Sequence, residues 1–298
     1  MTPRRSALFM PGHNERAIAK AKTLDCDVVI LDLEDAVAPD TKLRARSTAQ
    51  AALIDGGFDP REIAIRLNGF GTEWMADDLF AFHQVALDAL VVPKAESAED
   101  VFTLGEQMDA LGYRPDVELW LMAETPKGVL NARALCSAHP RVGALLIGTS
   151  DLAKCLRVPP SIGREGLIHA LSHCVLAARE ANIDVLDGVC LDLDHPELYQ
   201  LQCEHGRSLG FDGKTLIHPS QIHTANDVFA PSSDAIERAR SILDAWRKAL
   251  AAGEGLCVLD GQLVENLHVE EAERTLALHQ AIQARTTGHS SMFTGSKN

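Results

Sequence analysis

Eight short apolar segments recur along this chain, and their spacing constrains the fold more than any other feature of the sequence. Their residues are mostly apolar without alternation, which is typical of strands buried on both faces of a parallel sheet. Longer segments with helical spacing lie between them, and one of these begins at Ser97 with a capping serine followed by two acids. The predicted strands are residues 7–10, 28–33, 63–67, 89–92, 117–123, 144–147, 183–186 and 214–217.

Strands that alternate with helices over about 220 residues predict an α/β fold, specifically a (β/α)8 TIM barrel. A doubly wound open sheet is the second possibility. It is less favoured because it usually has fewer strands and a glycine-rich fingerprint that this sequence lacks. We therefore expect residues 1–220 to form a barrel domain that carries the catalytic site.

The pattern changes after residue 220. Residues 233–252 read as one amphipathic helix, 255–264 as a short hairpin with Asp260-Gly261 at its turn, and 270–284 as a final helix. Such an appendage exceeds what a barrel needs, so we expect residues 221–284 to cover a site or to pack on a neighbouring subunit. Residues 285–298 are polar with glycine and serine, and we expect them to be disordered.

Composition excludes several classes of protein. Hydrophobic residues make up 46% of the chain and charged residues 23%, as in an ordinary globular protein. The formal net charge of −14 argues against a nucleic-acid or anionic-membrane partner, because both require a basic surface. The 7 cysteines form no CxxC pair, and no apolar run has membrane-spanning length or the pattern of a signal peptide. We expect a soluble cytoplasmic protein without a disulfide framework.

Two of the apolar segments lead into acids, and these predict a divalent-metal site. Glu124 directly follows the segment 117–123, and Asp151 follows the segment 144–147 after three intervening residues. Neighbouring parallel strands would bring both carboxylates to the same edge of the sheet, where α/β proteins bind their ligands. Mg²⁺ is usually held by one or two carboxylates together with substrate and water. Glu124 and Asp151 are therefore the predicted Mg²⁺ ligands.

Other polar residues also follow the predicted strands. Polar groups placed directly after buried strands lose hydration unless they are paired or bind something. Arg66 follows the segment 63–65, and its planar guanidinium suits a carboxylate or an enolate oxygen. We expect the substrate to be bound by Arg66 together with Pro11, Lys94, Gly148, Thr149 and Ser150.

Asp32, Glu34 and Asp35 form a dense acidic group after the second predicted strand. Three acids on one turn repel one another unless a cation compensates them. We expect Glu34 and Asp35 to hold metal-bound water or to orient Arg66, and Asp32 to be structural. The alternative is that Asp35 caps a helix while Glu34 pairs with a surface lysine.

One motif resembles a binding signature without meeting its requirements. Residues 210–215 resemble a phosphate-binding loop, but Ser208 stands where that loop needs its first glycine. The lysine of this segment, Lys214, would also begin a strand rather than a helix. We expect no phosphate loop here.

Taken together, the motifs at the strand ends resemble those of a known family. They are LDLEDAV at 31–37, RLNG at 66–69, VPKAE at 92–96, AETP at 123–126, GTSDLA at 148–153 and GKTLIHPSQI at 213–222. The chain resembles the citrate lyase β-subunit-like proteins of the HpcH/HpaI aldolase superfamily, which includes malyl-CoA and citramalyl-CoA lyases. The resemblance runs from residue 8 to residue 261.

This resemblance implies a (β/α)8 barrel, Mg²⁺ and reversible C–C bond chemistry on a CoA thioester. Glu124 and Asp151 would bind Mg²⁺, which chelates an α-keto acid, and Arg66 would stabilise an enolate at the thioester. The expected function is a Mg²⁺-dependent lyase that cleaves or forms citramalyl-CoA or malyl-CoA, with acetyl-CoA and an α-keto acid as the other partners. The family also implies a homo-oligomer, a trimer or its multiple.

The general base is where the sequence departs from the family. The lyases use an aspartate on the C-terminal segment of a neighbouring subunit, and Glu265 occupies the matching position here. The extra methylene would shift a base by roughly 1 Å, which predicts a different substrate or weak lyase activity. Alternatively, Glu265 is a solvated hairpin residue.

Three further functions remain open at this point. The protein could be a citrate lyase β subunit acting on an acyl-carrier-protein thioester, or a catalytically weakened ligand-binding homologue. Thioesterase activity, in which water attacks the carbonyl, is another outcome of the same site.

Overall fold

The structure is a computed structural model that describes residues 2–159 and 164–293. The chain divides into two compact units. One comprises Arg4–Phe229, and the other comprises Ala230–Asn298 together with the first three residues. The first unit extends nine residues beyond the predicted barrel boundary at residue 220 (229 − 220) and includes a further helix.

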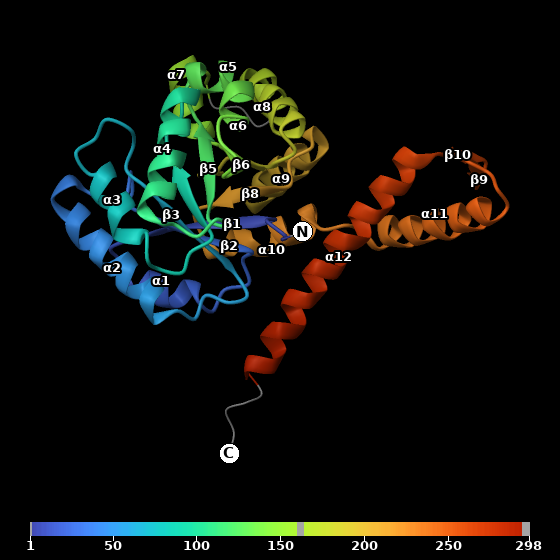
Figure 1. The fold of residues 1–298 in the computed structure, drawn as a ribbon, viewed down its shortest axis with the longest axis horizontal. Helices are drawn as coiled ribbons and strands as arrows, with labels where there is room; N and C mark the ends of the chain where they lie inside the picture. The colour runs from blue at the N-terminus through green and yellow to red at the C-terminus, as the bar shows by residue number, and fades with distance from the viewer. Residues whose placement is uncertain (1, 160–163, 294–298) are drawn as a thin grey trace. The chain divides into compact units, whose positions relative to one another are not determined.

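The first unit is a closed barrel of eight parallel strands in the order of the sequence (Figure 1). All eight predicted strands are confirmed, with ends within two residues of those expected, and with them the (β/α)8 fold. The strands are β1 (Ser6–Pro11), β2 (Val28–Asp32), β3 (Glu62–Arg66), β4 (Ala89–Val92), β5 (Glu118–Ala123), β6 (Val142–Ile147), β7 (Asp184–Asp187) and β8 (Gly213–Leu216).

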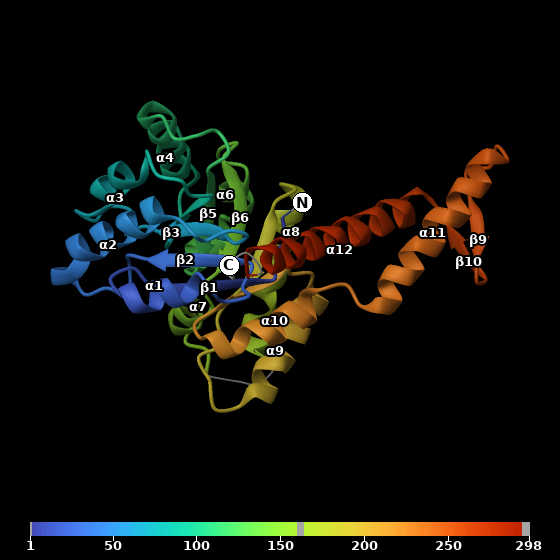
Figure 2. The same ribbon diagram turned by 90° about the horizontal axis from the view of Figure 1, so that it is seen from below.

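Helices surround this barrel (Figures 1 and 2), and several begin at the caps that the sequence encodes. The Asn14 side chain accepts from the amide of Ala17, and the Ser97 side chain accepts from the amide of Asp100. The α-helices of this unit are α1 (Glu15–Ala21), α2 (Lys42–Asp55), α3 (Met75–Phe82), α4 (Ala98–Leu111), α5 (Pro126–Leu130), α6 (Ala132–Cys136), α7 (Thr149–Leu156), α8 (Ile168–Glu180), α9 (Pro196–Leu209) and α10 (Ile222–Phe229). Short 3-10 helices cover Pro39–Thr41, Glu165–Leu167 and Pro219–Gln221.

The barrel is buried on both faces, as the continuous apolar segments require. Alternate strand residues fill its interior, where Trp120 is fully buried, and the others pack under the helices. The parallel register sets Asp32 of β2 beside Arg66 of β3 at the carboxyl end of both strands. This register brings polar side chains from different strands together at one end of the barrel.

The opposite, N-terminal end of the barrel is filled by an ion cluster around Arg4. The Arg4 guanidinium lies 2.8 Å from Glu62 and from Glu118 and 3.0 Å from Asp184, the first residues of β3, β5 and β7. It also stacks 4.6 Å from the centre of the Trp120 ring. Arg4 is only 9% exposed, so these groups close this end of the barrel.

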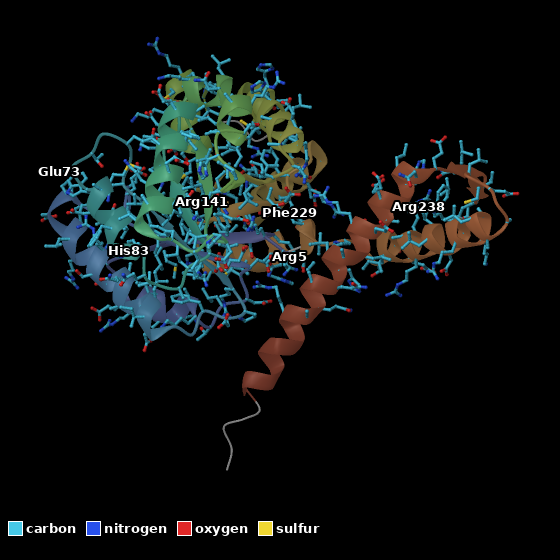
Figure 3. All side chains as sticks on the ribbon, in the orientation of Figure 1. Arg5, Glu73, His83, Arg141, Phe229 and Arg238 are labelled. Carbon is cyan, nitrogen blue, oxygen red and sulfur yellow. The ribbon has the colours of Figure 1, made fainter. Side chains whose placement is uncertain are left out.

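The second unit contains α11 (Ser233–Ala251), β9 (Cys257–Leu259), β10 (Gln262–Val264) and α12 (Asn266–Phe293). The predicted hairpin is confirmed. Asp260 and Gly261 both have positive φ, +49° and +76°, as a two-residue hairpin turn requires. A small core joins the hairpin to the two helices and contains Ala239, Ile242, Val264, Val269 and Ala272. Arg238 of α11, labelled in Figure 3, also hydrogen-bonds Gln262 of β10.

Helix α12 starts four residues before the predicted helix and continues to Phe293. The tail expected to be disordered at residues 285–298 therefore begins within this helix, and residues 294–298 lie outside the described part of the chain. Among the residues that the structure describes, no helix combines the length and apolarity that crossing a membrane requires.

Candidate active site

A cavity of about 410 Å³ lies at the carboxyl ends of the barrel strands. It receives residues from the ends of β1, β2, β3, β5, β6, β7 and β8 or from the loops that follow them. Most of the residues expected at the site line it: Pro11, Asp35, Arg66, Glu124, Gly148, Thr149, Ser150 and Asp151. Glu34 and Lys94 line a neighbouring cavity of about 680 Å³, which shares Asp35 with the first.

Glu124 directly follows β5 and is 2% exposed. Its Oε1 accepts a 2.7 Å hydrogen bond from the backbone amide of Lys94. Burial raises the pKa of this carboxyl to about 7, although the Lys94 amide opposes the rise. Gly148 provides room for the carboxylate, because a Cβ at that position would lie 2.3 Å from Glu124 Oε2.

Asp151 lies in the first turn of α7 and is half-buried. Within the described residues its carboxylate has neither a hydrogen bond nor an ion pair. The N-cap residue of this helix is Gly148, so no side chain caps it. The first amides of α7 therefore face no capping oxygen, and such a helix start favours a bound anion.

Arg66 is the last residue of β3, and its main partner is Asp32. The guanidinium Nε and Nη2 each lie 2.6 Å from an oxygen of Asp32, and Nη1 lies 3.1 Å from Glu34. Burial alone would lower the pKa of Arg66, but its hydrogen bonds to Asp32 and the charge of that carboxylate raise it. The guanidinium also lies 4.9 Å from the centre of the Phe9 ring.

We expected Glu34 and Asp35 to orient Arg66, yet Asp32 makes the bidentate contact with its guanidinium. The Asp32 carboxylate also accepts hydrogen bonds from the amides of Glu34 and Ala36 at 2.9 and 3.0 Å. It therefore shapes the acidic turn and holds Arg66 at the same time. The strand register pairs Asp32 with Arg66, and this pairing becomes visible only in the folded barrel.

The remaining acids are compensated by Lys94. Its ammonium hydrogen-bonds Glu34 and lies 3.9 Å from Asp35. Burial raises the pKa of Glu34 despite the opposing charges of Arg66 and Lys94. Glu34 thus does pair with a lysine, but the alternative that Asp35 caps a helix is wrong, because Thr41 stands at the start of α2.

The cavity wall also has an apolar part, which the sequence does not predict because polar residues at strand ends do not indicate apolar lining residues. This part consists of Phe9, Met10, Ala36, Met122, Ile147, Val189, Leu191 and Ile217, with Thr215 among them. Leu191 is 65% exposed and follows β7 in the loop before α9. These residues form an apolar wall beside the charged groups of the cavity.

Glu265 belongs to the second unit. It follows β10, is exposed, and its backbone amide donates to Nδ1 of His268 at 3.0 Å. Lys214, in the segment that resembles a phosphate loop, is instead fully buried and paired with Asp187 at 2.8 Å. The expectation that this segment binds no phosphate agrees with that burial.

The donors at the carboxyl ends of β5 and β6 fit a hard divalent cation. Within the described residues, Glu124 Oε2 has no hydrogen-bond donor and Asp151 has no partner at all. Neither carboxylate forms an ion pair within that part of the chain. Two carboxylates that line one cavity with open oxygens, neither of them in an ion pair with a described residue, form a donor set that Mg²⁺ prefers over softer ligands.

Comparison with known proteins places this geometry among related chains. A family model described as HpcH/HpaI aldolase/citrate lyase matches residues 5–219. A (3S)-malyl-CoA thioesterase of Cereibacter sphaeroides is 44% identical over 282 residues, which cover 95% of this chain and 96% of the relative. An L-malyl-CoA/beta-methylmalyl-CoA lyase of the same organism is 32% identical over 306 residues, with 95% and 96% coverage.

A solved structure extends the similarity to three dimensions. The CitE protein of Mycobacterium tuberculosis, in complex with magnesium, acetoacetate and coenzyme A, has a TM-score of 0.74 and 31% sequence identity. The match covers 91% of this chain and 96% of that one.

Proposed function

Because this chain belongs to the HpcH/HpaI aldolase/citrate lyase family, we propose that it is a Mg²⁺-dependent enzyme that hydrolyses (3S)-malyl-CoA or a related 3-hydroxyacyl-CoA. The products of that reaction are the free acid and CoA, with one water consumed. The thioesterase relative at 44% identity supports hydrolysis, and the magnesium in the CitE complex supports the metal.

One observation carries the proposal. The carboxylates of Glu124 and Asp151 and the guanidinium of Arg66 line the same cavity at the carboxyl end of the barrel. A small anionic acyl group needs such a combination of metal-binding acids and a fixed cation. Glu124 and Asp151 would hold the ion, and Mg²⁺ would supply Lewis-acid polarisation of the oxygens that the substrate presents.

The start of α7 would bind the carboxylate of the malyl group. Gly148 leaves the first amides of the helix without a side-chain cap, and Thr149 and Ser150 line the cavity there. Backbone amides at a helix start attract anions through their partial positive charge. This contact would orient the acyl group before the reaction.

Arg66 would stabilise negative charge on the thioester oxygen. Water that adds to the carbonyl leaves this charge on the oxygen until the sulfur departs, and fixed donors lower the energy of that state. Asp32 holds the guanidinium by two of its five N–H donors, so its position is set before substrate binds. Preorganisation of this kind removes the cost of reorienting the cation during the reaction.

Glu265 would take the proton from the attacking water. We propose that it comes from a second copy of the chain, as the C-terminal acid of the family's lyases does. A longer carboxylate side chain than aspartate would place the base differently with respect to the acyl group. That difference is consistent with abstraction from water rather than from the substrate hydroxyl.

The second candidate is the C–C lyase that the motifs predict, which releases acetyl-CoA and glyoxylate from malyl-CoA. It is supported by the lyase relative at 32% identity. C–C cleavage leaves an enolate whose charge lies on the same thioester oxygen, so Arg66 suits both reactions. The two reactions differ in where the base acts.

The decisive experiment is product analysis. Purified protein is incubated with (3S)-malyl-CoA, (S)-citramalyl-CoA and 3-hydroxy-3-methylglutaryl-CoA, with Mg²⁺ or with EDTA, and products are identified by mass spectrometry. We expect malate and free CoA, formed only with Mg²⁺. Acetyl-CoA and glyoxylate would establish the lyase instead, and no Mg²⁺-dependent turnover of any substrate would refute both. Turnover that requires an acyl-carrier protein would favour a citrate lyase subunit.

A further inference from the structure

Lys94 has a backbone conformation that non-glycine residues rarely adopt. Its φ is +49°, in the left-handed region, where the Cβ of an ordinary residue crowds the backbone. Lys94 stands two residues after the end of β4, on the loop at the carboxyl end of the barrel. Such conformations persist only where the surrounding contacts fix them, and they gather at functional sites.

The left-handed turn directs the amide of Lys94 to the neighbouring strand end. That amide lies 2.7 Å from Glu124 Oε1, and the next amide, of Ala95, bonds the carbonyl of Met122 on β5 at 3.1 Å. Gly148 bounds the Oε2 side of the same carboxylate. Glu124 is thus held on one side by a backbone donor and bounded on the other by a residue without a side chain.

The Lys94 side chain, in contrast, is already engaged. Its ammonium hydrogen-bonds Glu34 and lies near Asp35, and it lines the neighbouring cavity rather than the one that contains Glu124. Both acids compete with any substrate anion for this charge. The contact that reaches the metal-binding acid comes from the backbone.

We propose that Lys94 is a positioning residue whose left-handed backbone fixes the Glu124 carboxylate for metal binding. This replaces the expectation that its side chain binds substrate. The inference rests on the proposed function in one respect, that Glu124 is a Mg²⁺ ligand.

The test separates backbone conformation from side-chain charge. Lys94→Asn and Lys94→Val both remove the ammonium, but asparagine tolerates the left-handed region and valine does not. The Kd for Mg²⁺ is measured by titration calorimetry on each full-length variant, without substrate. We expect Lys94→Asn to bind Mg²⁺ within about threefold of the wild type and Lys94→Val to bind it about tenfold more weakly.

A second pair of variants, with smaller side chains, keeps the test valid if the valine variant does not fold. Lys94→Gly and Lys94→Ala differ by one methyl group, and glycine alone is unstrained at positive φ. The alanine variant should bind Mg²⁺ more weakly than the glycine variant, while thermal unfolding without Mg²⁺ confirms that both are folded. The KM for malyl-CoA is measured in parallel on all four variants.

The outcomes are distinct. Equal Mg²⁺ affinity within each pair, with KM raised about tenfold in every variant, would overturn the inference and restore a substrate-binding ammonium. A wild-type protein that binds no Mg²⁺ would refute the proposed function and this inference together. A wild type that binds Mg²⁺ alongside variants that do not differ refutes the Lys94 inference alone.

Discussion

At the scale of single residues, the site depends on side chains and backbone groups that hold other residues in place. Asp32 fixes Arg66 through two short contacts and folds its own turn through two backbone amides. Gly148 makes room for Glu124, and the Lys94 amide holds it. The sequence predicts the acids and the arginine, because polar residues after buried strands are conspicuous. It does not predict which residue holds which, because that depends on the register and on a single backbone angle.

A methyl group added at Gly148 should displace the Glu124 carboxylate from its position in the candidate metal site. A Cβ there would lie 2.3 Å from both Cβ and Oε2 of Glu124, well inside contact distance. We expect Gly148→Ala to weaken Mg²⁺ binding by at least about tenfold, as calorimetry would measure. Its φ of −82° is allowed for alanine, so the effect would be steric. Gly255→Ala, at a site with nothing within 4 Å and no positive φ, controls for the substitution; unchanged Mg²⁺ affinity in Gly148→Ala would contradict this account of the site.

Glu265 should decide which reaction the site performs. Shortening it to aspartate shifts the carboxylate by roughly 1 Å and restores the residue type that the family's lyases use. We expect Glu265→Asp to raise the ratio of acetyl-CoA to free CoA formed from malyl-CoA, and Glu265→Gln to lower both rates by about 100-fold. Mg²⁺ binding should stay unchanged in both. Full activity of Glu265→Gln would remove this residue from the mechanism.

At the scale of elements, the eight strands and the C-terminal hairpin could be predicted, because each depends on local signals. Continuous apolar runs mark strands buried on both faces, and Asp260-Gly261 marks a two-residue turn. The apolar lining of the cavity could not be predicted in the same way. Residues such as Met122 and Leu191 look like core or loop residues in the sequence, and only the closure of the barrel brings them to one cavity.

The ion cluster at the strand starts should make stability depend on pH. Burial raises the pKa of Asp184 above its ordinary value of 3.8, although Arg4 opposes the rise. A raised folded-state pKa means that the protonated carboxyl favours the fold, and that this contribution is lost as pH rises through the folded-state pKa. We therefore expect the free energy of unfolding of Asp184→Asn, relative to the wild type, to increase from about pH 4 to about pH 7 in urea titrations.

Asp55 provides a control of opposite sign. It is exposed, and the hydrogen bond and charge of Lys22 lower its pKa. A carboxyl with a lowered folded-state pKa stabilises the protein at pH values above its unfolded-state pKa, and this stabilisation is lost on acidification. Asp55→Asn should therefore lose stability relative to the wild type as pH rises toward about 4, and its difference from the wild type should stay constant from about pH 4 to about pH 7, where Asp184→Asn gains stability. Parallel pH profiles for the two variants would show that burial of Asp184 has no such effect.

At the scale of the whole molecule, the two units differ in how well they bury their apolar residues. The barrel has a large core, whereas the hairpin of the second unit leaves Val258 67% exposed and Leu263 48% exposed. These two residues are cross-strand partners and so share one face of the hairpin. Leu256 and Leu267, which flank the hairpin, are also exposed. We propose that a second copy of the chain covers this face in a homo-oligomer.

Charges on that face should separate the subunits. We expect the double variant Val258→Asp with Leu263→Asp to have a smaller mass by light scattering than the wild type and to lose turnover. Its Mg²⁺ affinity should persist, because both metal ligands lie in the barrel unit. Leu43→Asp, at a leucine of α2 that is 71% exposed, serves as the control and should leave the mass unchanged. A double variant of wild-type mass would place the oligomer contact elsewhere.

The Arg4 cluster also determines from which end small molecules can reach the cavity. In the part of the chain that the structure describes, Arg4, its three acids and Trp120 fill one end of the barrel. The cavity is therefore closed toward the strand starts, and a ligand enters and leaves it at the carboxyl end of the barrel. In the proposed hydrolysis, water, the incoming thioester and the departing acid would all pass through that end of the barrel. A free acid that stays in the cavity would exclude the next thioester, so we expect the product of the proposed hydrolysis to inhibit turnover.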